Sequence, residues 1–318
     1  MILSEGRVEP STIPTLYILD ICVVNATKLS EEALEANARK AALVKSLRDL
    51  DKPHNSISYF LALLEKTFDP RASLSVEELE AQILNDVATM RRFFINAKID
   101  ESDALLIGIM RAMKRQPCDP EQDIHLEFLR DVNSLGLANP VARANRLEMA
   151  RKILEKADSL SISRQHPTVL LTLGSLYGNV NARKVIKFKA DTNVFSAENA
   201  FADISIILRF LQFKFKTEES SDDHGRSYKR IQFLTDDIGL AGVLECFMGY
   251  EERVVGQDGI YQTMTGTYEI DFASLVTEID KGPSETPPTD RRNVRLLSEY
   301  DLLYDMILGR PNLIHIQL

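Results

Sequence analysis

The sequence is poor in the residues that build disulfide frameworks, zinc sites and phosphate-binding loops. Its 3 cysteines in 318 residues stand far apart, at Cys22, Cys118 and Cys246, and no two of them have the spacing of a disulfide framework or a zinc site. Its 14 glycines never form the G-x-x-x-x-G-K-S/T or G-x-G-x-x-G patterns that hold nucleotide phosphates. We therefore expect a protein of a reducing compartment, without a zinc centre or a glycine-rich phosphate loop.

Long hydrophobic runs are also missing. Residues 1–7 lack the basic region and the following apolar stretch of a signal peptide, and no stretch is long enough to span a membrane. The net charge of −9 argues against a protein that coats nucleic acid non-specifically, although a nuclease needs an acidic site of its own. Because both segments are missing, we expect a cytoplasmic protein, and because 44% of the residues are hydrophobic, we expect a sizeable core.

A short apolar run, Leu16-Tyr-Ile-Leu-Asp20, is the first organised feature of the chain. Such a run is typical of a strand that is buried on both faces of a parallel sheet. Asp20 would then lie at the carboxyl edge of the sheet, where open α/β sheets bind ligands. Asp is also common as the cap of a following turn, so a purely local role for Asp20 stays open.

Further acidic residues follow predicted strands or begin predicted helices. A strand over 55–58 precedes an apolar helix that carries Glu65, a helix from Ser196 carries Asp203, and a strand over 230–235 ends in Asp236-Asp237. Strands that alternate with helices predict an α/β fold with a parallel sheet. The carboxyl ends of its strands share one edge, where these acids could meet. Glu65 could equally be a solvated residue in the last turn of its helix.

The remaining elements are predicted to be largely helical. We expect residues 1–70 and 166–280 to form the two halves of the α/β core, with a helical insertion over 71–165 between them. A proline-rich linker and a last helix fill 281–318. Residues 168–177 could be helix or strand, and residues 216–229 are expected to form a polar surface loop. One apolar stripe at helical spacing runs through Val76, Leu79, Ile83, Val87, Met90 and Phe94.

The densest basic stretch lies between Asn181 and Lys189. Arg183, Lys184, Lys187 and Lys189 place four cations in nine residues of an acidic chain. They could form the solvated face of a helix, or a strip that binds the phosphates of a substrate beside an acidic site.

Clustered carboxylates repel one another unless a cation lies among them. Hard divalent ions such as Mg²⁺ or Mn²⁺ prefer sites made only of oxygen ligands. A site of this kind can ionise water and stabilise the charge that develops on a phosphoryl group. The acids at the sheet edge therefore predict a Mg²⁺ or Mn²⁺ site.

Four segments in order resemble the PIN-domain family of nucleases. They are residues 16–20, ending in Asp20; residues 56–65, with a strand, a serine and a helix that carries Glu65; residues 199–207, with Asp203 early in an apolar helix; and Phe233-Leu-Thr-Asp-Asp237. The resemblance implies a Rossmann-like three-layer core with a parallel sheet. It also implies that Asp20, Glu65, Asp203 and Asp237 bind metal, and that Thr235 helps to orient metal-bound water. Asp236 could share the role of Asp237.

The resemblance implies a metal-dependent endoribonuclease that leaves 5′-phosphate and 3′-hydroxyl ends, in the setting of a regulated toxin or defence effector. Two alternatives stay open: a structure-specific DNA nuclease, and a non-catalytic protein that keeps the fold and binds a partner. In the last case the helical insertion or the C-terminal helix would contact another protein or a second copy. No membrane partner is expected.

Overall fold

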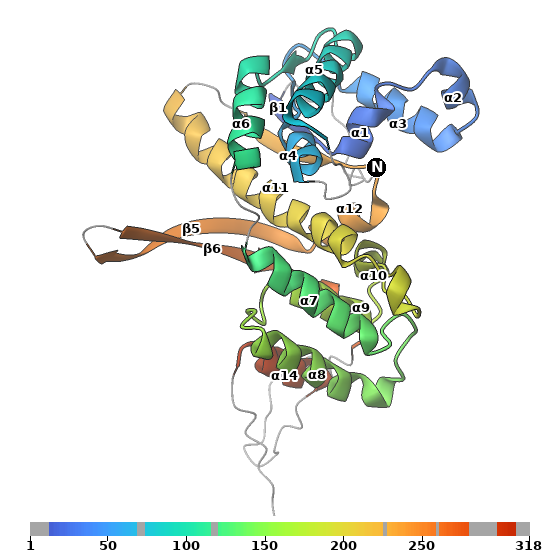
Figure 1. The fold of residues 1–318 in the computed structure, drawn as a ribbon, viewed down its shortest axis with the longest axis vertical. Helices are drawn as coiled ribbons and strands as arrows, with labels where there is room; N and C mark the ends of the chain where they lie inside the picture. The colour runs from blue at the N-terminus through green and yellow to red at the C-terminus, as the bar shows by residue number, and fades with distance from the viewer. Residues whose placement is uncertain are drawn as a thin grey trace, which may run out of the picture. The chain divides into compact units, whose positions relative to one another are not determined.

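The computed structural model describes residues 13–68, 74–115, 120–224, 228–258, 261–279 and 298–309. The chain divides into two compact units (Figure 1). The first comprises Met1–Cys118 and Ser205–Ile270, and the second comprises Asp119–Ile204 and Asp271–Leu318. The expected proline-rich linker over 281–290 lies outside the described residues.

A four-stranded parallel sheet forms the centre of the first unit, which confirms the α/β fold class. The strand order is β3-β2-β1-β4, and every neighbouring pair is parallel. The strands are β1 (Thr15–Leu19), β2 (Ser56–Ser58), β3 (Lys98–Ile99) and β4 (Arg230–Leu234). All five residues of β1 are buried, because the strand lies inside the sheet and helices connect it to its neighbours.

Helices follow the strands of the first unit. They are α1 (Ile21–Ala26), α2 (Glu31–Glu35), α3 (Ala38–Asp49), α4 (Phe60–Phe68), α5 (Val76–Phe93), α6 (Asp103–Arg115) and α12 (Ile238–Leu244). Their starts follow from side-chain caps that satisfy the first backbone N–H groups. Ser30 caps α2, Ser75 and Glu78 form a capping box on α5, and Asn37 begins α3. The cap at Asn37 separates α3 from α2.

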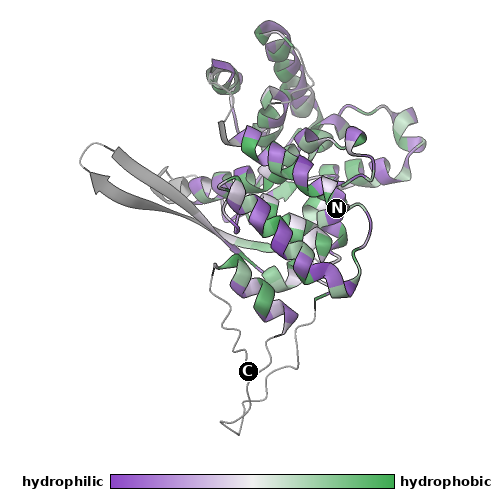
Figure 2. Ribbon diagram, turned by 60° about the horizontal axis from the view of Figure 1, so that its bottom comes forward, coloured by the Kyte–Doolittle hydropathy of each residue, from purple (hydrophilic) through white to green (hydrophobic). Residues whose placement is uncertain are grey.

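Helices α5 and α6 complete the core around the sheet. The buried residues Ile83, Val87 and Met110 belong to the same apolar cluster as Leu19 and Ile57 of the strands, and α4, α5 and α6 pack against one another (Figure 1). Hydrophilic and hydrophobic residues alternate along the helices of the chain, as expected for amphipathic helices (Figure 2). The first part of the stretch expected as an insertion therefore packs with the sheet.

Helix α11 (Ala197–His224) is longer than the sequence suggests. The loop expected over 216–229 is wrong for residues 216–224, which continue the helix. Lys and Glu are good helix formers, and the ammonium of Lys214 lies 3.9 Å from the carboxylate of Glu218, one turn further on. Two further strands, β5 (Phe247–Asp258) and β6 (Tyr261–Ile270), form an antiparallel pair.

The second unit is helical. Besides the start of α11 it contains α7 (Pro120–Ser134), α8 (Arg146–Ser159), α9 (Pro167–Leu176), α10 (Val180–Ile186), α13 (Phe272–Leu275), α14 (Glu299–Ile307) and two 3-10 turns, η1 (Arg143–Asn145) and η2 (Thr192–Val194). The stretch that the sequence leaves ambiguous is helix α9. Pro167 stands in its first turn, and His166 caps it by accepting a hydrogen bond from the backbone N–H of Thr168 at 3.2 Å.

Candidate active site at the carboxyl edge of the sheet

Asp20 lies where β1 ends and α1 begins, and it is only 3% exposed. Its Oδ1 accepts a hydrogen bond from the backbone N–H of Cys22 at 3.1 Å, and its Oδ2 accepts one from the hydroxyl of Thr235 at 2.5 Å. Asp20 is therefore both a helix cap and a buried carboxylate at the carboxyl edge. The structure confirms the local capping role and the position of Asp20 at the edge of the sheet.

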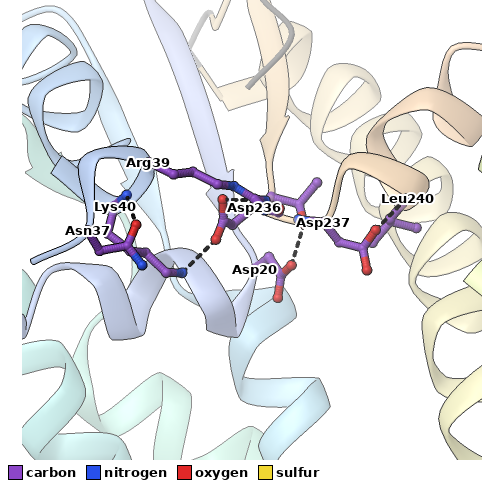
Figure 3. A network of polar contacts seen from close by, with 8 residues as sticks. Asp20, Asn37, Arg39, Lys40, Asp236, Asp237 and Leu240 are labelled. Atoms are coloured by element: carbon purple, nitrogen blue, oxygen red, sulfur yellow. Dashed lines mark hydrogen bonds and ion pairs between the residues drawn. The ribbon is translucent and has the colours of Figure 1, made fainter. Parts of the chain in front are cut away.

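Thr235 connects the ends of β1 and β4. Its hydroxyl donates to Asp20 and accepts a hydrogen bond from the backbone N–H of Asp237 at 2.9 Å. The Oδ1 of Asp237 in turn caps α12 by accepting from the backbone N–H of Leu240 at 2.9 Å. A chain of hydrogen bonds thus fixes the first and fourth strand ends relative to each other, as Figure 3 shows around Asp20 and Asp237.

Glu65 reaches the same strand end from helix α4. Its Oε1 accepts a hydrogen bond from the backbone N–H of Ile21 at 3.4 Å. Its helix therefore directs this carboxylate toward the start of α1, next to Asp20. Glu65 is only partly exposed, so it does not behave as a fully solvated residue of the last turn.

The side chain of Asp236 contacts two cations of helix α3, Arg39 and Lys40. Its Oδ1 lies 2.9 Å from Nη2 of Arg39 and its Oδ2 lies 2.5 Å from Nζ of Lys40, and Arg39 also donates to its backbone carbonyl. Partial burial disfavours the charged carboxylate, but the hydrogen bonds and charges of Lys40 and Arg39 hold the pKa of Asp236 below its usual range. Arg39 and Lys40 carry no local sequence feature that links them to Asp236, which is 196 or more residues away.

The pKa of the Cys22 thiol reflects the acidic side chains at this edge of the sheet. Its residue surface is exposed, yet the protein atoms around its thiol and the nearby carboxylates of Asp20 and Glu65 raise its pKa to about 12. Lys40 opposes this shift, and Asp236 adds to it.

Two buried acids, Asp86 and Glu101, form hydrogen bonds or ion pairs with the segments that carry the site, and the sequence did not indicate them. Asp86 of α5, which is 2% exposed, accepts a hydrogen bond from the hydroxyl of Tyr59 at 2.9 Å. It also pairs with Lys28 at 2.7 Å and with Lys66, the neighbour of Glu65, at 3.0 Å. Because α4 starts after Tyr59 and carries Lys66, this network fixes the helix that presents Glu65.

Glu101 is the second buried acid, and it follows β3. It accepts hydrogen bonds from the hydroxyl of Ser58 and, at 3.0 Å, from the backbone N–H of Tyr59. Burial raises the pKa of Glu101, although these two hydrogen bonds oppose the shift. Glu101 thus joins the ends of β2 and β3. Glu101 stands two residues after a strand of only two residues, Lys98–Ile99, and so short a strand has no recognisable sequence pattern.

Asp203 belongs to the second unit. Its Oδ2 lies 2.9 Å from Nζ of Lys187, so a predicted metal ligand pairs with a predicted phosphate-binding cation. In the same basic stretch, Arg183 donates to the carbonyl of Ser175 at 2.9 Å, whereas Lys184 is exposed. The backbone of Lys189 is fixed by Asn133 at 2.9 Å.

The carboxylate oxygens of Asp20, Glu65 and Asp237 are the donors that Mg²⁺ and Mn²⁺ prefer. In the part of the chain that the structure describes, however, no three His, Cys, Asp or Glu side chains stand in positions that could hold a metal ion. The donor chemistry therefore fits a hard divalent ion, and binding would require these side chains to turn toward a common centre.

Comparisons with known proteins leave the family of the chain open: no family model, no curated protein and no solved structure matches it. Among the described residues, no helix is sufficiently long and apolar to cross a membrane.

Proposed function

We propose that the protein is a metal-dependent nuclease, most simply an endoribonuclease, with its active site at the carboxyl edge of the sheet and a PIN-like core. The observation that carries this proposal is the environment of Asp20. Its carboxylate is 3% exposed, follows the inner strand β1, and accepts a hydrogen bond from the hydroxyl of Thr235. Glu65 accepts a hydrogen bond from the backbone N–H of Ile21, the residue that follows Asp20.

Asp20, Glu65 and Asp237 are the residues of the first unit that would hold Mg²⁺ or Mn²⁺. Such an ion lowers the pKa of a bound water and stabilises the negative charge of a phosphoryl group. Thr235 holds Asp20 and Asp237 at a fixed separation through its two hydrogen bonds. The buried pairs of Asp86 with Lys28 and Lys66 keep α4, and with it Glu65, in place.

The test is a cleavage assay on single-stranded RNA and single-stranded DNA with Mn²⁺, Mg²⁺ or EDTA, together with thermal melts under the same conditions. We expect metal-dependent cleavage of RNA, and a metal concentration 100 times Kd should stabilise the fold by about 2.7 kcal/mol. Asp20→Asn should abolish cleavage and blunt the stabilisation by metal. Asp49→Asn, which removes the same charge from an exposed position at the end of α3, is the matched control and should change neither.

Cleavage of DNA alone would replace RNA by DNA as the substrate. If neither nucleic acid is cut and no metal shifts the melting temperature, the nuclease proposal fails.

A non-catalytic, partner-binding protein is the second candidate, and one observation favours it. Both carboxylate oxygens of Asp20 accept hydrogen bonds from the protein, and both of Asp236 contact cations. When the carboxylates of a sheet edge already have hydrogen-bond and ion-pair partners within the protein, the edge can be stable without a metal ion. In that case Asp20→Asn would change stability, with or without metal, by the same amount.

A further inference from the structure

We propose that Arg39 and Lys40 are the phosphate-binding side chains of this site, and that Asp236 holds them until a single-stranded RNA displaces it. This inference rests on the proposed function, because it names the residues that bring the substrate to the site. It differs from the sequence-based expectation, which assigns phosphate binding to the basic stretch of residues 183–189.

The start of helix α3 fixes the position of both cations. Asn37 caps the helix by accepting a hydrogen bond from the backbone N–H of Lys40 at 3.0 Å, so Arg39 and Lys40 stand in the first turn. From there both side chains reach the residue that follows Thr235, across 196 residues of sequence or more (Figure 3). The first turn of α3 and the end of β4 therefore form one surface beside Asp20.

The charges on this surface do not cancel. One carboxylate, Asp236, faces two cations, which leaves an excess of one positive charge beside an otherwise acidic edge. The side chain of Asp236 is 14% exposed, whereas those of Lys40 and Arg39 are 32% and 57% exposed. The cations are thus the solvent-facing members of the group, and a polyanion reaches them before it reaches the carboxylate.

The contacts leave Arg39 capable of a second interaction. A guanidinium carries five N–H donors in a planar fork, and both of its contacts with Asp236 use the same nitrogen, Nη2. Asp236, which both cations contact, directly follows Thr235, and the hydroxyl of Thr235 donates a hydrogen bond to Asp20. A phosphate held by these two cations would therefore lie beside the carboxylates that the proposed reaction requires.

The competing explanation is a structural ion pair that only ties α3 to β4. The two explanations give opposite signs for one substitution. Asp236→Asn removes the charge that competes with phosphate, so it should tighten RNA binding if Arg39 and Lys40 are phosphate ligands. If the ion pair only joins two elements, Asp236→Asn loosens the structure and gains no affinity.

The experiment measures the affinity of a fluorescent single-stranded RNA oligonucleotide by anisotropy in EDTA, so that no cleavage occurs, at several salt concentrations. We expect Arg39→Gln/Lys40→Gln to weaken binding roughly 25-fold at 0.1 M salt, about five-fold for each lost contact, and to reduce the slope of log K against log salt by about 1.4. Lys45→Gln/Lys52→Gln removes the same charge from two exposed positions in and after α3, and it should leave the slope unchanged.

Three variants decide the outcome even if one of them is unstable. Asp236→Asn should bind more tightly than the wild type, and the triple variant Arg39→Gln/Lys40→Gln/Asp236→Asn should lose that gain. The inference is overturned if the two double variants lower the slope equally, or if Asp236→Asn binds no more tightly. Equal effects on single-stranded RNA and DNA would still support phosphate contacts, because the backbone phosphates are common to both.

Failure of this inference can be told apart from failure of the proposed function. The binding measurement needs no metal and no turnover, whereas the nuclease proposal depends on metal-dependent cleavage by the wild type. If the wild type binds RNA through Arg39 and Lys40 but never cuts it, this inference holds and the nuclease proposal fails. A wild type that cuts RNA while both cations are dispensable would do the reverse.

Discussion

Replacing Thr235 by valine removes a hydroxyl from the candidate site and keeps the branched shape of the side chain. The hydroxyl takes part in two hydrogen bonds: it donates to Oδ2 of Asp20 at 2.5 Å and accepts from the backbone N–H of Asp237 at 2.9 Å. Thr235 is 8% exposed and Asp20 is 3% exposed, so water cannot easily replace the lost partner. We expect Thr235→Val to destabilise the first unit and to disorganise the site.

The magnitude follows from the two contacts. A hydrogen bond to a charged group contributes about 1.5–3 kcal/mol, and a neutral one contributes about 1 kcal/mol. The sum predicts a loss of about 2.5–4 kcal/mol for Thr235→Val. Thr235→Ser keeps the hydroxyl and loses one methyl group, which costs about 1 kcal/mol in a packed position. The difference between the two variants isolates the hydroxyl.

The assay is urea denaturation of the wild type and both variants, followed by the cleavage assay. Because the chain has two units, the two transitions should be analysed separately. A loss smaller than about 1 kcal/mol for Thr235→Val, or equal losses for valine and serine, would refute the bonding described here. If the nuclease proposal holds, Thr235→Val should lower kcat more than it raises KM, because the hydroxyl positions Asp20 through a hydrogen bond.

Three further predictions concern groups that the structure buries. Asp86→Ala should lower the free energy of unfolding by about 3–5 kcal/mol, because it leaves Lys28 and Lys66 without their buried partner. Asp103→Ala removes an exposed pair with Arg91 and should lower it by at most about 1 kcal/mol. Urea denaturation measures both changes. The raised pKa of Glu101 means that the folded state holds its proton more tightly, so stability should fall as the pH rises from the usual carboxyl pKa through the folded value, and Glu101→Gln should flatten that slope in melts from pH 4 upward. Burial, with a smaller effect of His125, lowers the pKa of His166 to about 3; stability should therefore be lost as the pH falls from about 6.5 toward 3, and His166→Asn, which keeps the capping acceptor, should lose less over that range.

Local sequence predicts what local chemistry determines. The run before Asp20 and the run before Asp236 are short, apolar and followed by acids, so both strands and their shared edge could be expected from their patterns. The caps Ser30 and Ser75 are determined by neighbours within three residues, and they too could be predicted. The polarity of residues 218–224, by contrast, suggested a loop, because composition alone does not separate a solvated helix face from a turn.

Contacts between distant segments could not be predicted from one sequence. The apolar stripe of α5 shows which face of the helix is buried, but it does not show that the sheet covers this face, so residues 76–115 were expected in a separate insertion. Arg39 and Lys40 have no local feature that sets them apart from other exposed cations. Their significance depends on a contact with Asp236 that only the folded chain creates.

The tandem acids that follow β4 illustrate how one strand end can serve two functions. Successive side chains of an extended segment point in opposite directions, and those of Asp236 and Asp237 do so. Asp236 contacts the cations of α3. Asp237 caps α12, and its backbone N–H donates to the hydroxyl of Thr235. Sequence spacing could not decide which of the two belongs with Asp20. The hydrogen bond from the backbone of Asp237 to the hydroxyl that also holds Asp20 links Asp237 to the carboxylate group, whereas the lowered pKa of Asp236 follows from its cations. In the proposed function the two adjacent acids therefore have different roles. Asp237 would belong with Asp20 in the active site, and Asp236 would hold Arg39 and Lys40, the proposed phosphate ligands.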